Sequence, residues 1–309
     1  MASRSPDVPA QPASGLKPIP GTLKAGAGEP VYKKPKLPPA EAIRGYYDVV
    51  APLLLRDAAR RPLNLLRCTA GHCFYQRNRA HPASGDDFQP PIRFLPIAQK
   101  NGRTEDYLYV DDAAGVAKCA AAGAVEFHAW GTRAEHVEQP DRLAFDLDPG
   151  EEIGFAEVKY AAIRMHDFLA ELGLRSFALL SGGKGIHVVV PHAPAENWDT
   201  FRAFARAICA ALAEAEPEHF TIALPKAERI GRIFLDFLRN QRTATAILPY
   251  SLRARAGAPI AAPVAWEELE ETGSADRFTI MDTPLLLERA RSRALRGWGE
   301  ADQVLPRIA

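Results

Sequence analysis

Leu-Ala-Phe-Asp-Leu-Asp-Pro-Gly, at residues 143–150, holds the strongest structural signal in the chain. Successive side chains of a β-strand point to opposite faces, so Asp146 and Asp148 share one face while Phe145 and Leu147 enter the core. Two adjacent carboxylates repel one another unless a cation neutralises them, and hard oxygen ligands suit Mg²⁺ or Mn²⁺. Because a D-x-D pattern is common, the motif alone favours a strand end with two solvated aspartates before a turn; the alternative is a strand end that binds a divalent metal.

The elements expected around this strand alternate between helix and strand. Apolar residues recur at helical spacing for about 20 residues after Phe155, and again on one helix face between 201 and 212. Hairpin-like neighbours around 176–191 favour a mixed sheet over a purely parallel one, so we expect an α/β fold with a mixed sheet and flanking helices. The predicted strands are Tyr107–Val110, Val125–Trp130, Arg142–Asp148, Ser176–Leu180, Ile186–Pro191 and Arg232–Leu238. Further helices are predicted at Ala42–Val50, which Pro52 interrupts or restarts, at 112–122 and at 284–298.

The composition is that of an ordinary globular protein. The 309 residues are 47% hydrophobic and 25% charged, with a net charge of zero, so the overall charge does not indicate a nucleic-acid partner. No run of about 18 apolar residues is present to span a membrane. Four cysteines are too few for a disulfide framework, so we expect a reducing cytoplasm. Cys68 and Cys73 flank His72, but no second ligand pair lies at zinc spacing.

Two segments differ from the rest of the chain. Residues 1–30 hold six of the 26 prolines and almost no large apolar residue, which predicts a flexible tail. A catalytic domain is expected at 31–300, followed by a short C-terminal tail at 301–309. Residues 1–40 and 228–255 each carry six basic against two acidic residues, a local charge of +4. The simplest interpretation of such a cluster is a solvated face.

A glycine-rich turn lies within Leu-Ser-Gly-Gly-Lys-Gly-Ile-His-Val-Val-Val-Pro, residues 180–191. Glycines allow backbone N–H groups to approach an anion closely, and Lys184 adds a positive charge. The spacing differs from that of a Walker A loop. The alternative is a hairpin with a solvent-exposed lysine, in which His187 is a core residue.

A third group of residues lies at 228–240 and 250–255. Asp236 falls inside an apolar strand, where an unpaired carboxylate is costly, so either an arginine or a metal ion is expected beside it. Arg229, Arg232 and Arg253 have the forked guanidinium that binds phosphate. The alternative is a buried ion pair next to a solvated basic face.

In this order, the three groups resemble the archaeo-eukaryotic primase superfamily, and most closely the polymerase domain of bacterial ATP-dependent DNA ligase D. The resemblance runs from about Tyr32 to near residue 300 and includes the motifs Cys-Phe-Tyr-Gln at 73–76, Phe-His-Ala-Trp at 127–130 and Pro-Tyr-Ser-Leu-Arg-Ala-Arg at 249–255. No Lys-x-Asp-Gly adenylation motif occurs, so this chain does not resemble a ligase by itself.

The resemblance implies a primase-like fold and a template-dependent DNA or RNA polymerase that extends primer 3′-hydroxyls by two-metal phosphoryl transfer. It assigns catalytic, metal-binding roles to Asp146, Asp148 and Asp236. It assigns contacts with the incoming nucleotide to Ser181, Lys184, His187, Arg253 and Arg229, with His128 beside the sugar. Phe74, with Tyr75, matches an aromatic that stacks on the template, and Lys33, Lys34 or Lys36 would hold a downstream 5′-phosphate.

The implied cofactors are two Mn²⁺ or Mg²⁺ ions, and the implied substrates are NTPs or dNTPs. The implied partners are DNA ends and gaps with a 5′-phosphate, together with Ku and the ligase and nuclease domains of ligase D, in bacterial non-homologous end joining at the nucleoid. Two departures stand out. Arg239-Asn240 replaces the Gln-Asn of some members, and Pro38-Pro39 lies where members often have Thr-Lys.

Two other functions fit parts of the pattern. A non-catalytic module that binds and aligns DNA ends would not require three carboxylates. A glycosyltransferase with a D-x-D motif would use Mn²⁺ to bind a nucleotide sugar, but would need neither Asp236 nor the glycine turn. The presence of all three groups favours the polymerase.

Overall fold

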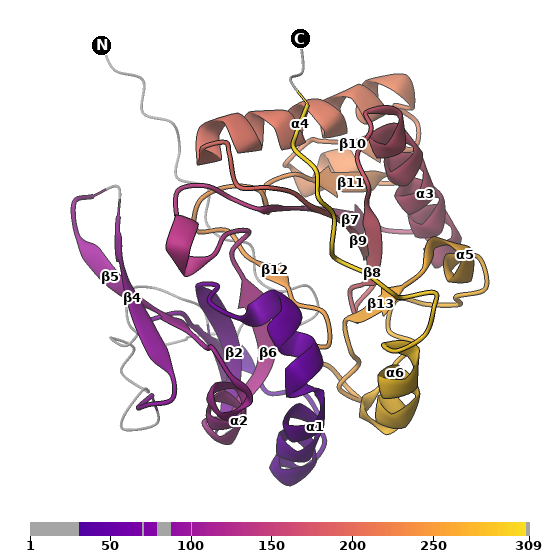
Figure 1. Ribbon diagram of the computed structural model, residues 1–309. Coiled ribbons are helices and arrows are strands. Elements are labelled where there is room, and N and C mark those ends of the chain that lie inside the picture. The colour runs from indigo at the N-terminus through magenta and orange to yellow at the C-terminus, as the bar shows by residue number, and fades with distance from the viewer. Residues whose placement is uncertain (1–30, 70, 79–87, 100, 307–309) are drawn as a thin grey trace.

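Two large β-sheets and a small hairpin build the computed structural model, which describes residues 31–69, 71–78, 88–99 and 101–306 (Figure 1). The strands are β1 (Val31–Lys33), β2 (Leu63–Thr69), β3 (His72–Gln76), β4 (Arg93–Ala98), β5 (Thr104–Tyr109), β6 (Ala124–Ala129), β7 (Arg142–Pro149), β8 (Phe177–Leu180), β9 (Ile186–Pro191), β10 (Phe220–Thr221), β11 (Ile233–Asp236), β12 (Ala246–Ile247) and β13 (Ala262–Val264). The α-helices are α1 (Ala40–Ala58), α2 (Ala113–Ala121), α3 (Phe155–Glu171), α4 (Trp198–Ala215), α5 (Trp266–Leu269) and α6 (Thr283–Arg289). Short 3₁₀ helices lie at Ala134–His136, Lys226–Arg229 and Ile280–Asp282.

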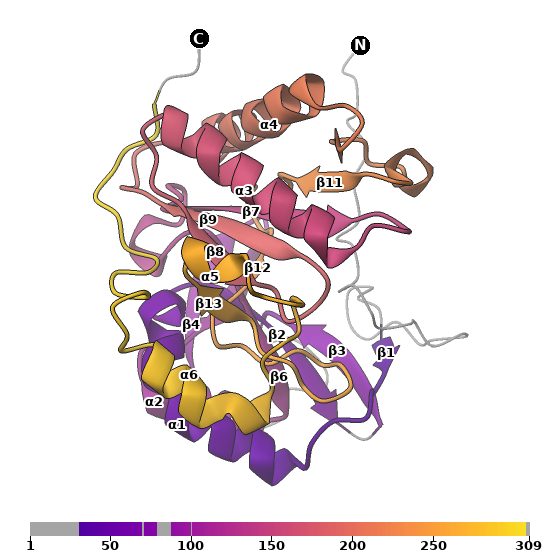
Figure 2. The same ribbon diagram turned by 90° about the vertical axis from the view of Figure 1, so that its right-hand side faces the viewer.

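The six-stranded sheet has the order β10-β11-β7-β9-β8-β13. Strand β7 lies in its interior and is antiparallel to both neighbours, while β10 and β11 are parallel, so the predicted mixed sheet is confirmed. Helix α3 packs on β7 and β9, and α4 packs on β10 and β11 (Figure 2). Phe145 and Leu147 are fully buried and Asp146 and Asp148 only partly, as the alternation of β7 predicts.

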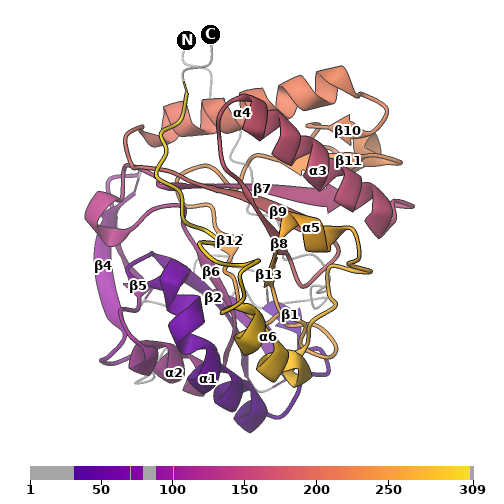
Figure 3. The same ribbon diagram turned by 45° about the vertical axis from the view of Figure 1, so that its right-hand side comes forward.

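The five-stranded sheet has the order β1-β3-β2-β6-β12 and forms the other half of the molecule, where α2 packs on β6 and α1 packs on α2. Helix α6 lies against α1 (Figure 3). Hydrogen bonds from this half reach the segment that follows β12: the Tyr46 hydroxyl donates to the Tyr250 carbonyl at 2.8 Å. The two sheets are thus parts of one folded unit.

The first helix differs from its prediction because α1 continues through Pro52 to Ala58. Pro52 is exposed, whereas its neighbours Ala51 and Leu53 are buried in the core. A proline inside a helix removes one backbone hydrogen bond. The apolar face of α1 continues on both sides of Pro52, and its packing outweighs this local cost.

The chain ends also differ from the prediction. Helix α6 ends at Arg289, because the following residues form successive turns rather than the continuous helix predicted to 298. Gln303 donates from its side chain to the Pro191 carbonyl at 2.6 Å and accepts from the Arg175 backbone N–H at 2.8 Å, which fixes part of the predicted C-terminal tail against β9. The predicted N-terminal tail, residues 1–30, lies outside the described residues.

No helix within the described part of the chain has both the length and the apolar character needed to cross a membrane.

Candidate active site

Three aspartates gather at one end of β7. Asp236 on β11 is the direct antiparallel partner of Asp146 on β7. Directly opposed residues of an antiparallel pair project to the same face, and Asp148 joins them two residues further along β7. The three carboxylates predicted from the sequence therefore lie on one face of the six-stranded sheet, near the end of β7 at Pro149.

Arg239 lies between two of these carboxylates. Its Nη2 is 3.3 Å from Asp146 Oδ2, and its Nε is 3.1 Å from Asp236 Oδ2. The Asp236 side chain is further fixed by the Leu238 backbone N–H, which donates to Oδ1 at 2.8 Å. The sequence had marked Arg239 only as a departure from related chains, because register across two strands is needed to place it.

The pKa values of the three aspartates differ. Burial and the negative charge of Asp146 raise the pKa of Asp148 to about 6. Burial also raises the pKa of Asp236, against the opposing effect of Arg239. For Asp146, burial is outweighed by His187 and Arg239, which hold its pKa well below the usual range. The raised pKa values of Asp148 and Asp236 indicate that these two carboxylates lack sufficient positive charge nearby, which a bound cation would supply.

The donor chemistry of this cluster fits a divalent cation that prefers hard oxygen ligands, since three carboxylates lie on one face of the sheet. In the described residues, no three Asp, Glu, His or Cys side chains converge into a ready metal cage. Mg²⁺ and related ions commonly take one or two carboxylates and complete their shell with water and substrate phosphates. Asp146, Asp148 and Asp236 could therefore hold such ions together with a phosphate-bearing substrate.

The glycine turn lies directly against the carboxylates. Gly182 has a φ of +65°, and a Cβ there would lie 2.8 Å from Arg253 Cγ. A Cβ on Gly185 would lie 2.4 Å from the Leu147 carbonyl oxygen and 3.6 Å from Asp146 Oδ1. These contacts leave no room for a side chain, which is why glycines occupy the turn between β8 and β9.

His187 is the β9 partner of Asp146. Its Nε2 is 3.3 Å from Asp146 Oδ1, and the side chain is 6% exposed. Among the described residues, none forms a hydrogen bond with its buried Nδ1. An imidazole nitrogen buried beside the glycine turn without a partner fits a ligand atom at this place. Ser181 is buried in the same turn, and Lys184 is exposed at its tip.

Arg253 connects the turn to the five-stranded sheet. Its Nη1 donates to the Ser181 carbonyl at 2.7 Å, and its Nε lies 3.3 Å from Glu126 Oε2. Glu126 Oε2 is also 2.7 Å from His128 Nε2. The predicted nucleotide-contacting residues Ser181, His187, Arg253 and His128 are thus brought together where the two sheets meet.

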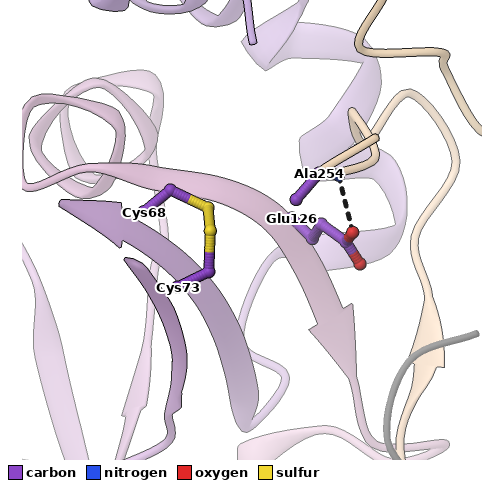
Figure 4. Close-up of a disulfide and its surroundings, with 4 residues drawn as sticks. All are labelled: Cys68, Cys73, Glu126 and Ala254. Atoms are coloured by element: carbon purple, nitrogen blue, oxygen red, sulfur yellow. Dashed lines mark hydrogen bonds between the residues drawn. A yellow bond between two sulfur atoms is a disulfide. The ribbon is translucent and has the colours of Figure 1, made fainter. Parts of the chain in front are cut away.

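Glu126 belongs to this group of paired side chains, although the sequence pattern did not single it out. It is 1% exposed and accepts a hydrogen bond from the Ala254 backbone N–H at 2.7 Å, as Figure 4 shows. Burial opposes its ionisation, but Arg253 and His128 outweigh burial and lower its pKa to about 2. The available signal was strand alternation, which places Glu126 and His128 on the same face of β6.

Arg229 does not contact the carboxylates. It is buried, and it donates from Nε to the Ala223 carbonyl at 3.0 Å and from Nη2 to the Leu224 carbonyl at 2.6 Å. Its guanidinium carbon lies 3.6 Å from the centre of the Phe234 ring. Since Phe234 pairs with Asp148 across the strands, Arg229 lies beside the cluster rather than within it.

The aromatic and basic residues predicted to contact DNA lie on and next to β1 and β3. Phe74 is 2% exposed with the Arg67 guanidinium 5.5 Å from its ring centre, whereas Tyr75 is half-buried and its ring centre is 5.7 Å from that of His128. Tyr75 is therefore the more accessible of the two. The exposed basic side chains lie at the end of β1, which pairs with β3, and just after it: Lys33 is the last residue of the strand, and Lys34 and Lys36 follow.

The cysteine expectation was wrong for one pair. Cys68 on β2 and Cys73 on β3 form a disulfide, which Figure 4 shows. They are direct cross-strand partners with Cα atoms 4.1 Å apart, a proximity set by the strand register that cysteine number does not reveal. Cys119 and Cys209 are free, buried thiols.

A cavity of about 650 Å³ lies at the other end of β7 and does not include the predicted site. Its lining includes Arg61 and Asp141, which form an ion pair, and Arg142 and Asp57, which form another at 2.8 Å. These ion pairs connect the end of α1 to the start of β7, so we assign them a structural role.

Comparison with known proteins identifies a family and several relatives. The family described as LigD, primase-polymerase domain, matches residues 41–293. The multifunctional non-homologous end joining protein LigD of Pseudomonas aeruginosa is 33% identical over 303 residues, which cover 91% of this chain and 35% of that protein. A LigD protein of Mycobacterium bovis is 32% identical over 237 residues, covering 73% of this chain and 30% of that protein. The chain thus spans about a third of the length of these relatives.

A solved structure is also similar. It is the polymerase domain of ligase D from Mycobacterium tuberculosis in complex with DNA, with a TM-score of 0.74 and 29% identity. The match covers 83% of this chain and 91% of that one.

Proposed function

This chain belongs to the LigD primase-polymerase domain family, and on that premise we propose that it is a template-dependent nucleotidyltransferase that extends the 3′-hydroxyl of a DNA primer. The observation that carries the proposal is the direct pairing of Asp146 with Asp236, on the same face as Asp148 and next to the glycine turn. A glycosyltransferase would need only the first part of this arrangement.

The proposed metal ligands are Asp146, Asp148 and Asp236, and the ions are Mn²⁺ or Mg²⁺. When bound, a pair of such ions activates an attacking oxygen and stabilises a departing one in phosphoryl transfer. The chain's own contribution is to hold the three carboxylates on adjacent strands of a rigid sheet. Their excess negative charge draws cations to the end of β7.

The incoming NTP or dNTP is proposed to place its phosphates against the turn at 181–185. Lys184 is free to reach them from the tip, Arg253 offsets charge from the other side, and the buried Nδ1 of His187 is available to a phosphate oxygen. His128 is proposed to contact the sugar, held in place by Glu126 at 2.7 Å. Arg229 is proposed to offset the negative charge of the phosphates from a position outside the cluster.

The proposed nucleic-acid substrate is a DNA end or gap in the repair of double-strand breaks by non-homologous end joining. Tyr75 is proposed to stack on the template, which tolerates any base because every base has a π-face. Phe74, the other predicted stacking residue, is 2% exposed and would have to move to contact a base. Lys34 and Lys36, with Lys33, are exposed and well placed for phosphates, including a downstream 5′-phosphate. Ku, and ligase and nuclease domains, are the proposed partners, and the bacterial nucleoid is the proposed location.

Primer extension tests this function. A labelled primer on gapped DNA would be incubated with Mn²⁺ and NTPs or dNTPs, with Asp146→Ala alongside. The matched control is Asp167→Ala, which changes an exposed aspartate on α3. Templated addition by the wild type and by Asp167→Ala, but not by Asp146→Ala, is expected.

Two results would contradict the proposal in different ways. Addition retained in Asp146→Ala would mean that the carboxylate is not a catalytic ligand. Firm DNA binding by the wild type without any addition would favour the end-aligning module instead.

A further inference from the structure

Arg239 occupies the space between Asp146 and Asp236 that a bridging cation would also use. The two carboxylates are directly opposed across β7 and β11, and the guanidinium contacts both, at 3.3 and 3.1 Å. A guanidinium and a divalent ion cannot share this space, because like charges repel and the same carboxylate oxygens serve both. The side chain is 31% exposed, so it has a route out of the cluster.

We propose that Arg239 is the resident counter-cation of the carboxylate cluster and competes with the divalent metal for Asp146 and Asp236. This inference rests on the proposed metal site. It follows that metal binds tightly only when the guanidinium has left both carboxylates.

The phosphates of a nucleoside triphosphate would accept the displaced guanidinium. Arginine binds phosphate with two parallel hydrogen bonds, as it binds a carboxylate. Arg239 lies beside the proposed nucleotide site, because the Asp146 carboxylate that it contacts at 3.3 Å is also 3.3 Å from His187 Nε2. Metal and nucleotide would then bind cooperatively. The nucleotide draws Arg239 away from the carboxylates that the metal needs, and the metal in turn releases Arg239 to contact the nucleotide.

The test measures Mn²⁺ binding directly. The six-line electron paramagnetic resonance signal of free Mn²⁺ is lost on binding, so a titration gives the dissociation constant without catalysis. Without nucleotide, Arg239→Gln is expected to bind Mn²⁺ at least about tenfold more tightly than the wild type, since a mutually exclusive cation is removed. Arg242→Gln is the matched control, because Arg242 lies three residues further and pairs with Glu138 at 2.9 Å; its affinity is expected to be unchanged.

Cooperativity provides a second readout. A non-hydrolysable nucleoside triphosphate is expected to tighten Mn²⁺ binding several-fold more in the wild type than in Arg239→Gln, because the variant has no guanidinium to relocate. Arg239→Lys keeps the charge but cannot bridge two carboxylates, so its Mn²⁺ affinity is expected between the other two. This variant also serves if Arg239→Gln does not fold.

The possible outcomes are distinct. Equal or weaker Mn²⁺ binding in folded Arg239→Gln would overturn the inference, since it would show that Arg239 does not exclude the metal. Absence of Mn²⁺ binding in every variant would overturn both the inference and the metal site. The expected affinities in a chain that does not extend primers would support the inference and overturn the proposed polymerase function.

Discussion

At the scale of single residues, the site depends on groups whose charges are paired across the sheets. Glu126 is the central example, because its carboxylate contacts Arg253, His128 and the Ala254 backbone N–H. Sequence predicted the face of Asp146 and Asp148, which follows from alternation alone. Glu126 and Arg239 were missed, because their partners lie on other elements and only the register brings them together.

Replacing Glu126 by Gln is expected to destabilise the protein by about 3 kcal/mol, because Arg253 remains buried without a counter-charge. The KM for nucleotide is expected to rise, since Arg253 and His128 lose the group that orients them. Urea unfolding and steady-state extension would measure the two effects. Glu138→Gln is the control, because Glu138 is 65% exposed in its pair with Arg242, and a change within about 0.5 kcal/mol is expected.

Acid pH provides a separate test of the same residue. The pKa of Glu126 is lowered in the folded state to about 2, so its ionised form stabilises the fold. This contribution is complete above the unfolded-state pKa of about 4.3 and is lost as the pH falls through the folded value. The difference in unfolding free energy between wild type and Glu126→Gln should therefore be constant from pH 7 to 5 and shrink below pH 4. A difference that grows on acidification would contradict this assignment.

At the scale of elements, the sequence predicted most of the helices and strands around the site. Boundaries agree within a residue or two for β7, β9 and α2, where apolar periodicity is strong. Helix α3 starts where expected and has 17 residues, somewhat fewer than predicted. Periodicity did not predict β2 and β3, which lie on either side of a short turn. The predicted end of the first helix was also too early, because a local pattern does not reveal that the neighbours of Pro52 are buried.

The glycine turn gives an element-scale prediction. Gly185→Ala is expected to destabilise the protein by more than about 2 kcal/mol and to abolish extension, because its Cβ would lie 2.4 Å from a β7 carbonyl next to the carboxylates. Gly45→Ala in α1 meets no atom within 4 Å, and it should stabilise the helix by up to about 1 kcal/mol. Urea unfolding of both variants, with extension assays, measures the contrast. Equal effects of the two substitutions would show that the turn is not closely packed.

At the scale of the whole molecule, ion pairs join the end of α1 to the six-stranded sheet, at the end of β7 that lies away from the candidate active site. Arg142 is 4% exposed and contacts Asp57 at 2.8 Å. Arg142 lies four residues before Asp146 on β7, which corresponds to roughly 13 Å along a strand. The fold class was predictable from alternating elements, but the joining of two sheets was not, because it depends on contacts such as this one.

Asp57→Ala is therefore expected to lower stability by about 3 kcal/mol, because Arg142 is left buried without its partner, while kcat per folded molecule changes less than about twofold. Asp48→Ala, which changes an exposed aspartate on the same helix, should leave both unchanged. Thermal unfolding and extension below the unfolding transition provide the measurements. A large loss of kcat in folded Asp57→Ala would mean that this end of β7 is coupled to the site.

The pairing of Asp146 with Asp236 has a consequence for folding. These partners are 90 residues apart in the chain, whereas His187, the other strand partner of Asp146, is 41 residues away. Contacts between distant segments form late, because a long loop must close before they gain any stability. A nascent or partly refolded chain that has paired β7 with β9 thus holds two of its three carboxylates, and under the proposed function it would be inactive. Recovery of extension during refolding should report closure of the last strand pair, after the recovery of helical circular dichroism.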